Sequence, residues 1–231
     1  MKSKRIKVVL VMLTIALLAV GGTYAYFTDI AEATNMFVYT TDIDAELYEP
    51  NWDPDKGLKI QPDTSIPKDP QIKNECQIDE YVGMKLTFRD GFGTTLNQAQ
   101  MDVLLTLIDI QYYDGNNALQ DGYNPLWIAF EGSTTTPVQY FYYDAILQPN
   151  VSTAPIFDVV TFKRSITNEQ YAWLNGSAAY DHDNDPATPA IAQLIKGLEI
   201  YVEGAAIQSA GFANGGETTI ELKTLLDTAV P

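Results

Sequence analysis

Apolar and polar residues alternate along residues 81–88, with the two-residue period of a β-strand that is buried on one face. Val82, Met84, Leu86 and Phe88 fall on one side of this strand, and the residues between them fall on the other. The same alternation runs through residues 198–208, and shorter runs predict strands at residues 141–147, 156–162 and 218–222. Turns rich in Gly, Pro, Asn and Asp separate these runs, which is typical of an antiparallel β-sandwich.

Three short helices are predicted in the connections between the strands. Each begins at a capping signal: Thr95 with Gln98, Thr167 with Gln170, and Thr188 with Pro189. Apolar residues at helical spacing follow each signal, and Gly197 would end the third helix. We therefore expect a mainly β fold with a few short helices.

The N-terminus has the three parts of a secretory signal. Residues 1–7 hold four basic residues and no acid, residues 8–20 form an apolar run, and small residues follow it. Their spacing favours cleavage between Ala25 and Tyr26. The run is shorter than the ~20 residues that span a bilayer, and an uncleaved anchor is the alternative interpretation. Residues 1–25 are thus predicted to be a signal peptide, and residues 26–231 a single secreted domain.

Charge and cysteine content narrow the classes of partner. The full chain has a formal net charge of −16, and removal of the four basic residues in the signal changes it to −20. Such a surface repels nucleic acid, so no nucleic-acid partner is expected, and it favours divalent cations. Cys76 is the only cysteine, so no disulfide can form within the chain. We expect it to be a buried thiol rather than an intermolecular bridge.

The sequence contains no motif that would indicate catalysis. His182 is the only histidine, whereas the HExxH zinc motif needs two histidines one helical turn apart. A GxSxG nucleophile motif is also missing from the sequence. Pairs of carboxylates are too common in an acidic protein to indicate glycoside hydrolysis. We therefore predict no catalytic residues and no organic cofactor.

One acidic run has the spacing of a candidate calcium site. Asp181, Asp183 and Asp185 alternate in a turn, and such oxygens can converge on one Ca²⁺. The EF-hand pattern fails, because Pro186 stands where its glycine belongs and Ala192 where its closing glutamate belongs. A solvated acidic loop before the helix predicted at Pro189 is the favoured interpretation, and a calcium site is the alternative.

Several segments resemble the TasA and camelysin (CalY) family, whose members are secreted proteins of biofilm matrices processed by the signal peptidase SipW. Residues 21–29 resemble the family's signal and cleavage zone, although Thr40 stands in the next segment where a glycine is usual. The segments that carry the resemblance follow in order and span nearly the whole secreted chain: 21–29, 35–37, 42–44, 66–74, 81–82, 142–157 and 205–212.

The resemblance implies a jelly-roll β-sandwich, cleavage by a SipW-type peptidase, and assembly with copies of itself into fibres of the extracellular matrix or cell surface. In such fibres the N-terminal segment of one subunit completes a sheet of its neighbour. Residues 26–47 would hold that segment, with residues 27–38 as the donated strand and Phe27, Phe37 and Val38 as assembly residues. The alternative is that the segment folds back into its own sandwich.

Two other functions are compatible with the sequence. Camelysin has been described as a surface metallopeptidase, which a chain with one His and one Cys fits poorly. The second is a monomeric surface module that binds polysaccharide or another matrix protein through aromatic residues such as Tyr140 and Tyr143. In an alternating strand, such residues are more often core or cross-strand partners, and we favour that interpretation.

Overall fold

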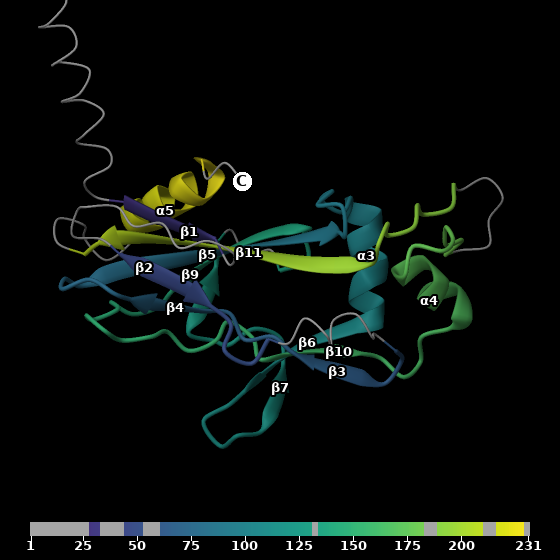
Figure 1. The fold of residues 1–231 in the computed structure, drawn as a ribbon, viewed down its shortest axis with the longest axis horizontal. Coiled ribbons are helices and arrows are strands. Elements are labelled where there is room, and N and C mark those ends of the chain that lie inside the picture. Colours follow the sequence, from purple (N-terminus) through teal and green to yellow (C-terminus); the bar gives the residue numbers. More distant parts are fainter. Residues whose placement is uncertain are drawn as a thin grey trace, which may run out of the picture.

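The computed structural model describes residues 28–32, 44–52, 61–130, 134–182, 189–209 and 216–228, and within them the chain is mainly β (Figure 1). The strands are β1 (Thr28–Glu32), β2 (Ala45–Tyr48), β3 (Thr64–Pro67), β4 (Gln71–Asn74), β5 (Glu80–Asp90), β6 (Ile108–Tyr113), β7 (Leu119–Asp121), β8 (Trp127–Ala129), β9 (Val138–Tyr143), β10 (Val159–Phe162) and β11 (Leu198–Gln208). The helices of the described ranges are α3 (Gln98–Leu107), α4 (Asn168–Leu174) and α5 (Gly216–Thr228). No helix in these ranges has both the length and the hydrophobicity needed to cross a bilayer.

The strands pair as if the chain were one long hairpin folded over on itself. Early strands pair with late ones in nested order: β1 with β11, β3 with β10, β5 with β9, and β6 with β7. Further antiparallel pairs join these into a five-stranded sheet, β1-β11-β5-β9-β8, and a four-stranded sheet, β3-β10-β6-β7. A short ladder of β2 and β4 completes the described strands.

The two large sheets share one apolar core. The inward side chains of β5, from Val82 to Phe88, have no exposed surface, which confirms the strand predicted at residues 81–88. Val202 on β11 joins them from the same sheet, and Val160 and Phe162 on β10 join them from the other. The alternation of β5 and β11 therefore gave the correct buried face, because each strand lies inside a sheet with one face on this core.

Two of the shorter strand predictions had wrong bounds. β9 ends at Tyr143, and Leu147 lies instead in an isolated bridge to Glu80, where it is buried. β10 begins only at Val159, because Ile156 and Phe157 enter the core from the preceding loop. Apolar residues that anchor a loop to the core thus look like strand residues in the sequence.

The helix predictions were confirmed at α4, where Thr167 and Gln170 form the expected capping box. The predicted start of α3 was wrong by two residues, since the capping box consists of Asn97 and Gln100. Thr95 cannot take that place because its backbone is bridged to Arg89 on β5. The helix therefore begins after the chain has left the sheet.

The helix predicted from Pro189 to Gly197 is wrong over its described residues. Ile191 forms an antiparallel bridge with Tyr180, and the Leu194 N–H donates to the Trp173 carbonyl at the end of α4. Positive φ angles at Lys196 and Gly197 then turn the chain into β11. These contacts hold the segment extended against α4, and its weak local helix signal does not outweigh them.

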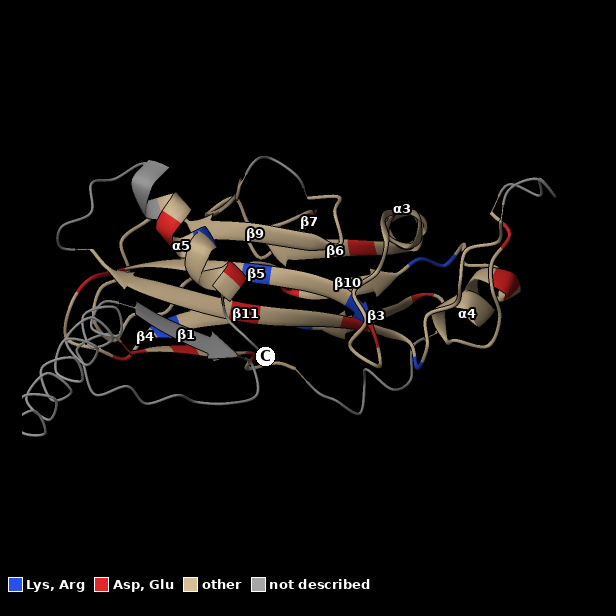
Figure 2. Ribbon diagram, turned by 90° about the horizontal axis from the view of Figure 1, so that it is seen from above, with Lys and Arg blue, Asp and Glu red and all other residues tan. Residues whose placement is uncertain are grey.

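The strand predicted at residues 218–222 is also wrong, because these residues lie within α5. Leu222, Leu225 and Leu226 have the spacing of one helical face, and all three are buried. This face packs on the side of the five-stranded sheet that points away from the core, and seen from above α5 crosses the sheet's strands (Figure 2). A run of five residues is too short for alternation to distinguish a strand from a helix.

Candidate assembly edge at β1 and β11

The candidate functional site is the edge of the five-stranded sheet, where β1 pairs with β11. The pairing is antiparallel and in register over all five residues of β1, from Thr28 opposite Ile207 to Glu32 opposite Glu203. These two strands lie near opposite ends of the sequence. β1 therefore completes the sheet through main-chain pairing with a strand that the chain reaches only after the rest of the sheet.

The β11 strand is covered on both of its faces along this edge, since every residue from Val202 to Ile207 is buried. On the inner face, β2 and β4 come close to Gly204. A Cβ on Gly204 would lie 3.2 Å from Ile72 Cδ1 and 3.6 Å from Leu47 Cβ. A larger residue at position 204 would push these strands away, so the glycine permits the close approach.

On the outer face, α5 packs on Ala205 and Ile207 through Leu222, Leu225 and Leu226. The helix approaches the sheet at Gly83 on β5, where a Cβ would lie 3.4 Å from Leu222 Cβ and 3.4 Å from Leu226 Cδ1. Gly83 lies opposite Ala205 in the β5–β11 register. Small residues on two neighbouring strands thus form the surface on which the apolar face of the helix lies.

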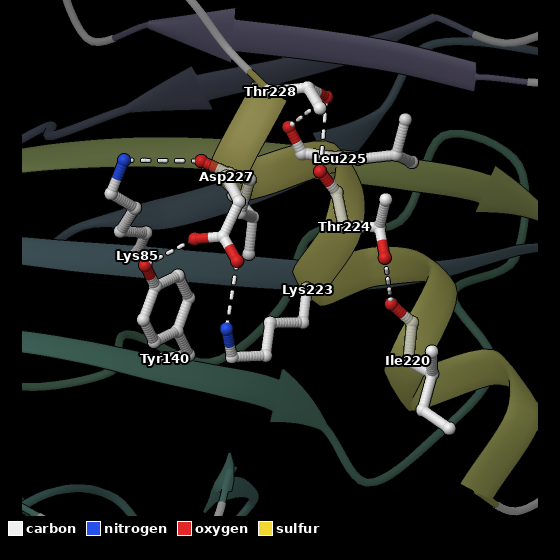
Figure 3. Close-up of polar contacts among 9 residues, drawn as sticks. Lys85, Tyr140, Ile220, Lys223, Thr224, Leu225, Asp227 and Thr228 are labelled. Carbon is white, nitrogen blue, oxygen red and sulfur yellow. Dashed lines mark hydrogen bonds and ion pairs between the residues drawn. The ribbon is translucent and has the colours of Figure 1, made fainter.

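A charged pair is buried next to this apolar contact. Lys85 Nζ lies 2.8 Å from Glu203 Oε2, and the side chains retain only 16% and 3% of their exposure. The same ammonium donates to the Leu226 carbonyl of α5 at 3.1 Å (Figure 3). Because the carbonyls in the last turn of a helix lack partners within the helix, a cation there is favourable. Lys85 therefore ties β5, β11 and the end of α5 together.

Tyr140 on β9 makes the second polar contact with α5, by donating its hydroxyl hydrogen to Asp227. Lys223 Nζ donates to the other Asp227 oxygen at 2.8 Å and lies 4.5 Å from the centre of the Tyr140 ring. Partial burial acts to raise the pKa of Asp227, but the hydrogen bonds from Lys223 and Tyr140 outweigh it and hold that pKa below its usual value. Burial, and then the hydrogen bond to Asp227, raise the pKa of Tyr140. The contact is thus one of a carboxylate with a neutral phenol.

Most of the residues predicted to act in assembly, processing or calcium binding lie outside the described residues: Ala25, Tyr26, Phe27, Phe37, Val38, Asp183 and Asp185. Of the predicted donated strand, the structure describes Thr28–Glu32, which is β1. In this single chain β1 pairs with its own β11, as the alternative interpretation of the segment predicts. Asp181 is described and is exposed. In the described part of the chain, no three His, Cys, Asp or Glu side chains gather in a way that could hold a metal ion.

The aromatic side chains of β9 pack against other rings or the core, and the thiol of the single cysteine is buried. Phe141 is buried, Tyr143 packs against the Trp127 ring at 5.1 Å, and Tyr142 packs against Phe130 at 5.3 Å. The Cys76 thiol is buried and contacts the side-chain oxygens of Asn74 and Glu80, at 2.9 and 3.0 Å. The expectations of packed aromatics and of a buried thiol are therefore confirmed.

No protein-family model, no curated protein and no solved structure matches this chain.

Proposed function

We propose that the chain is a secreted structural subunit that assembles with copies of itself into extracellular fibres, in which β1 of one copy pairs with β11 of the next. This proposal includes a signal peptide at residues 1–25 that a SipW-type peptidase removes, and a single jelly-roll β-sandwich at residues 26–231. Residues 26–47 then carry the donated strand. The fibres belong to the matrix or surface of a Gram-positive-type cell.

The nested pairing of the strands supports the jelly-roll topology. In a jelly roll, a long antiparallel hairpin is wrapped so that its strand pairs alternate between two sheets. Here the first and third nested pairs, β1–β11 and β5–β9, lie in the five-stranded sheet. The second and fourth pairs, β3–β10 and β6–β7, lie in the four-stranded sheet.

The pairing of β1 with β11 at the sheet edge is the observation that carries the proposal. A strand held at an edge by main-chain pairing can be replaced by the same strand of another copy, which forms identical bonds. Such an exchange links head to tail and continues indefinitely when the geometry does not close a ring. The cover of β11 by β2, β4 and α5 then gives an incoming strand a defined slot rather than a flat edge.

The experiment compares the secreted form, residues 26–231, with three variants by negative-stain electron microscopy. One lacks residues 26–38, one carries both Ile30→Pro and Ala31→Pro, and the matched control carries both Ile30→Val and Ala31→Val. Proline is tolerated in an edge strand where its missing N–H would face solvent, but neighbouring N–H groups of a strand point to opposite sides, so one of two adjacent prolines removes a bond to β11. Valine favours strands. Filaments from the parent and the double valine variant alone are the expected result. Filaments from the variant that lacks residues 26–38 would contradict strand donation, and single particles from the parent would favour a monomeric binding module.

A further inference from the structure

α5 contacts both the edge strand β1 and the strands in the body of the five-stranded sheet. α5 crosses the outer face of the five-stranded sheet and contacts β9, β5, β11 and β1. Its Ile220 end lies toward β9 and its Thr228 end toward β1 (Figure 3). The helix therefore bridges the edge strand and three strands that belong to the body of the sheet.

We propose that α5 is a strap that retains β1 on its own β11 and thereby sets the rate at which copies exchange this strand. The strap is fixed to the sheet next to the edge by Leu226, which has no exposed surface, and by the bond from Lys85 to the Leu226 carbonyl. β1 has β11 as its strand partner on one side only, so its contacts with α5 on the outer face and with β2 are the further restraints on it.

The strap acts on the rate of exchange rather than on its end point. A β1 strand from a neighbouring copy would lie on β11 in the same register and would contact α5 in the same way. The α5 contact is therefore present both before and after exchange and cancels from the overall free energy. It is lost only in the intermediate in which β1 is free, so it raises the barrier. The effect on assembly rests on the proposed function, whereas the retention of β1 does not.

The polar contacts of α5 make the restraint local. Asp227 and Lys223 join the helix to Tyr140, and Lys85 joins it to β5 and β11. None of these contacts involves the inner core shared by the two sheets. Loosening α5 should consequently make β1 leave β11 more often, while its contact with β2 and the rest of the sandwich remain, as expected of a local opening.

The test is hydrogen–deuterium exchange of the secreted form, residues 26–231, measured on dilute monomer. Leu226→Ala removes the buried anchor, Asp227→Ala removes the polar contact, and Ile220→Ala is the matched control because Ile220 is 67% exposed on the same helix. We expect amides of Thr28–Glu32 to exchange at least about tenfold faster in Leu226→Ala, in line with the loss of one buried leucine. Amides of β6 and β10 should keep their protection, and Ile220→Ala should match the parent.

Faster exchange in α5 with unchanged exchange in β1 would overturn the strap. If Leu226→Ala loosens the whole domain, the same comparison with Asp227→Ala decides the matter, since that change leaves the apolar face intact. Filament formation is recorded separately, by light scattering. Freed β1 without filaments would support the strap and contradict the fibre proposal. Filaments that require β1, with hydrogen exchange of β1 unaffected by either variant, would support the fibre proposal and contradict the strap.

Discussion

Lys85 and Glu203 lie opposite each other on β5 and β11, and their charged groups meet at 2.8 Å beneath α5. Removal of one partner from a buried pair leaves an uncompensated charge, which is costlier than removal of both. We expect Lys85→Ala to lower the free energy of unfolding by about 3 kcal/mol, measured in urea.

Lys223→Ala is the control for Lys85→Ala in the measurement of unfolding free energy. Its ion pair with Asp227 lies at the surface, with side chains 33% and 42% exposed, so its loss should cost about 0.5 kcal/mol. The double variant Lys85→Met with Glu203→Leu should recover most of the loss caused by Lys85→Ala. Equal stability of Lys85→Ala and the parent would show that the pair does not anchor the sheet.

Gly83 is predicted to be the position at which a side chain separates α5 from the sheet. A Cβ there would lie 3.2 Å from the Phe141 carbonyl oxygen, in addition to its contacts with Leu222 and Leu226. We expect Gly83→Val to destabilise the domain by about 1–3 kcal/mol and to make α5 sensitive to protease. Gly115→Val is the control, because nothing lies within 4 Å of a Cβ at that turn. Protease resistance of α5 in both variants would contradict this packing.

The Cys76 thiol should be unreactive in the folded protein. Burial, followed by the hydrogen bond to Glu80, raises the pKa of Cys76 to about 11. Because only the thiolate reacts, we expect native protein at pH 8 to react with a disulfide reagent at least about a hundredfold more slowly than protein in urea. Equal rates in the two conditions would place the thiol at the surface.

The same shift makes stability depend on alkaline pH. A thiol whose pKa is higher in the folded state stabilises that state below the unfolded value, about 8.5, and the stabilisation is lost as pH rises toward 11. The difference in unfolding free energy between the parent and Cys76→Ala should therefore shrink across this range. A difference that stays constant from pH 8 to 11 would exclude the contribution of Cys76.

The elements that were predictable from the sequence are those in which the pattern of apolar and polar residues is long and only one face is buried in the core. β5 shows this best, since alternation along Val82 to Phe88 corresponds to a strand with one face on the shared core. α5 was missed because residues 218–222 alternate over only five positions, while its true signal, the spacing of Leu222, Leu225 and Leu226, continues beyond them. A local pattern of apolar residues thus predicts an element only where it runs long enough to distinguish the two-residue period of a strand from the 3.6-residue period of a helix.

The candidate site was less predictable than the fold. The hypothesis that an N-terminal strand acts in assembly came from the resemblance, and the sequence did not indicate which edge would receive such a strand. The candidate edge is defined by the pairing of Thr28 with Ile207, two residues far apart in the chain. The feature of the sequence that could have indicated this edge is its small residues, because they permit close packing on both faces of the sheet: Gly83, Gly204 and Ala205. Their meaning depends on contacts with β2, β4 and α5 that only the folded chain brings together.

Exchange of β1 between copies is tested most directly by cross-linking across the β1–β11 register. Ile30 lies opposite Ala205, so cysteines at these two positions lie within disulfide range. Two proteins, Ile30→Cys and Ala205→Cys, each also carrying Cys76→Ala, are mixed, assembled and oxidised. The off-register pair Asp29→Cys and Ala205→Cys is the control. We predict a disulfide-linked dimer of the two different chains in the filaments, and little or none in the control. Filaments that contain no such dimer, while a single chain with both Ile30→Cys and Ala205→Cys forms the bond internally, would show that β1 stays on its own β11.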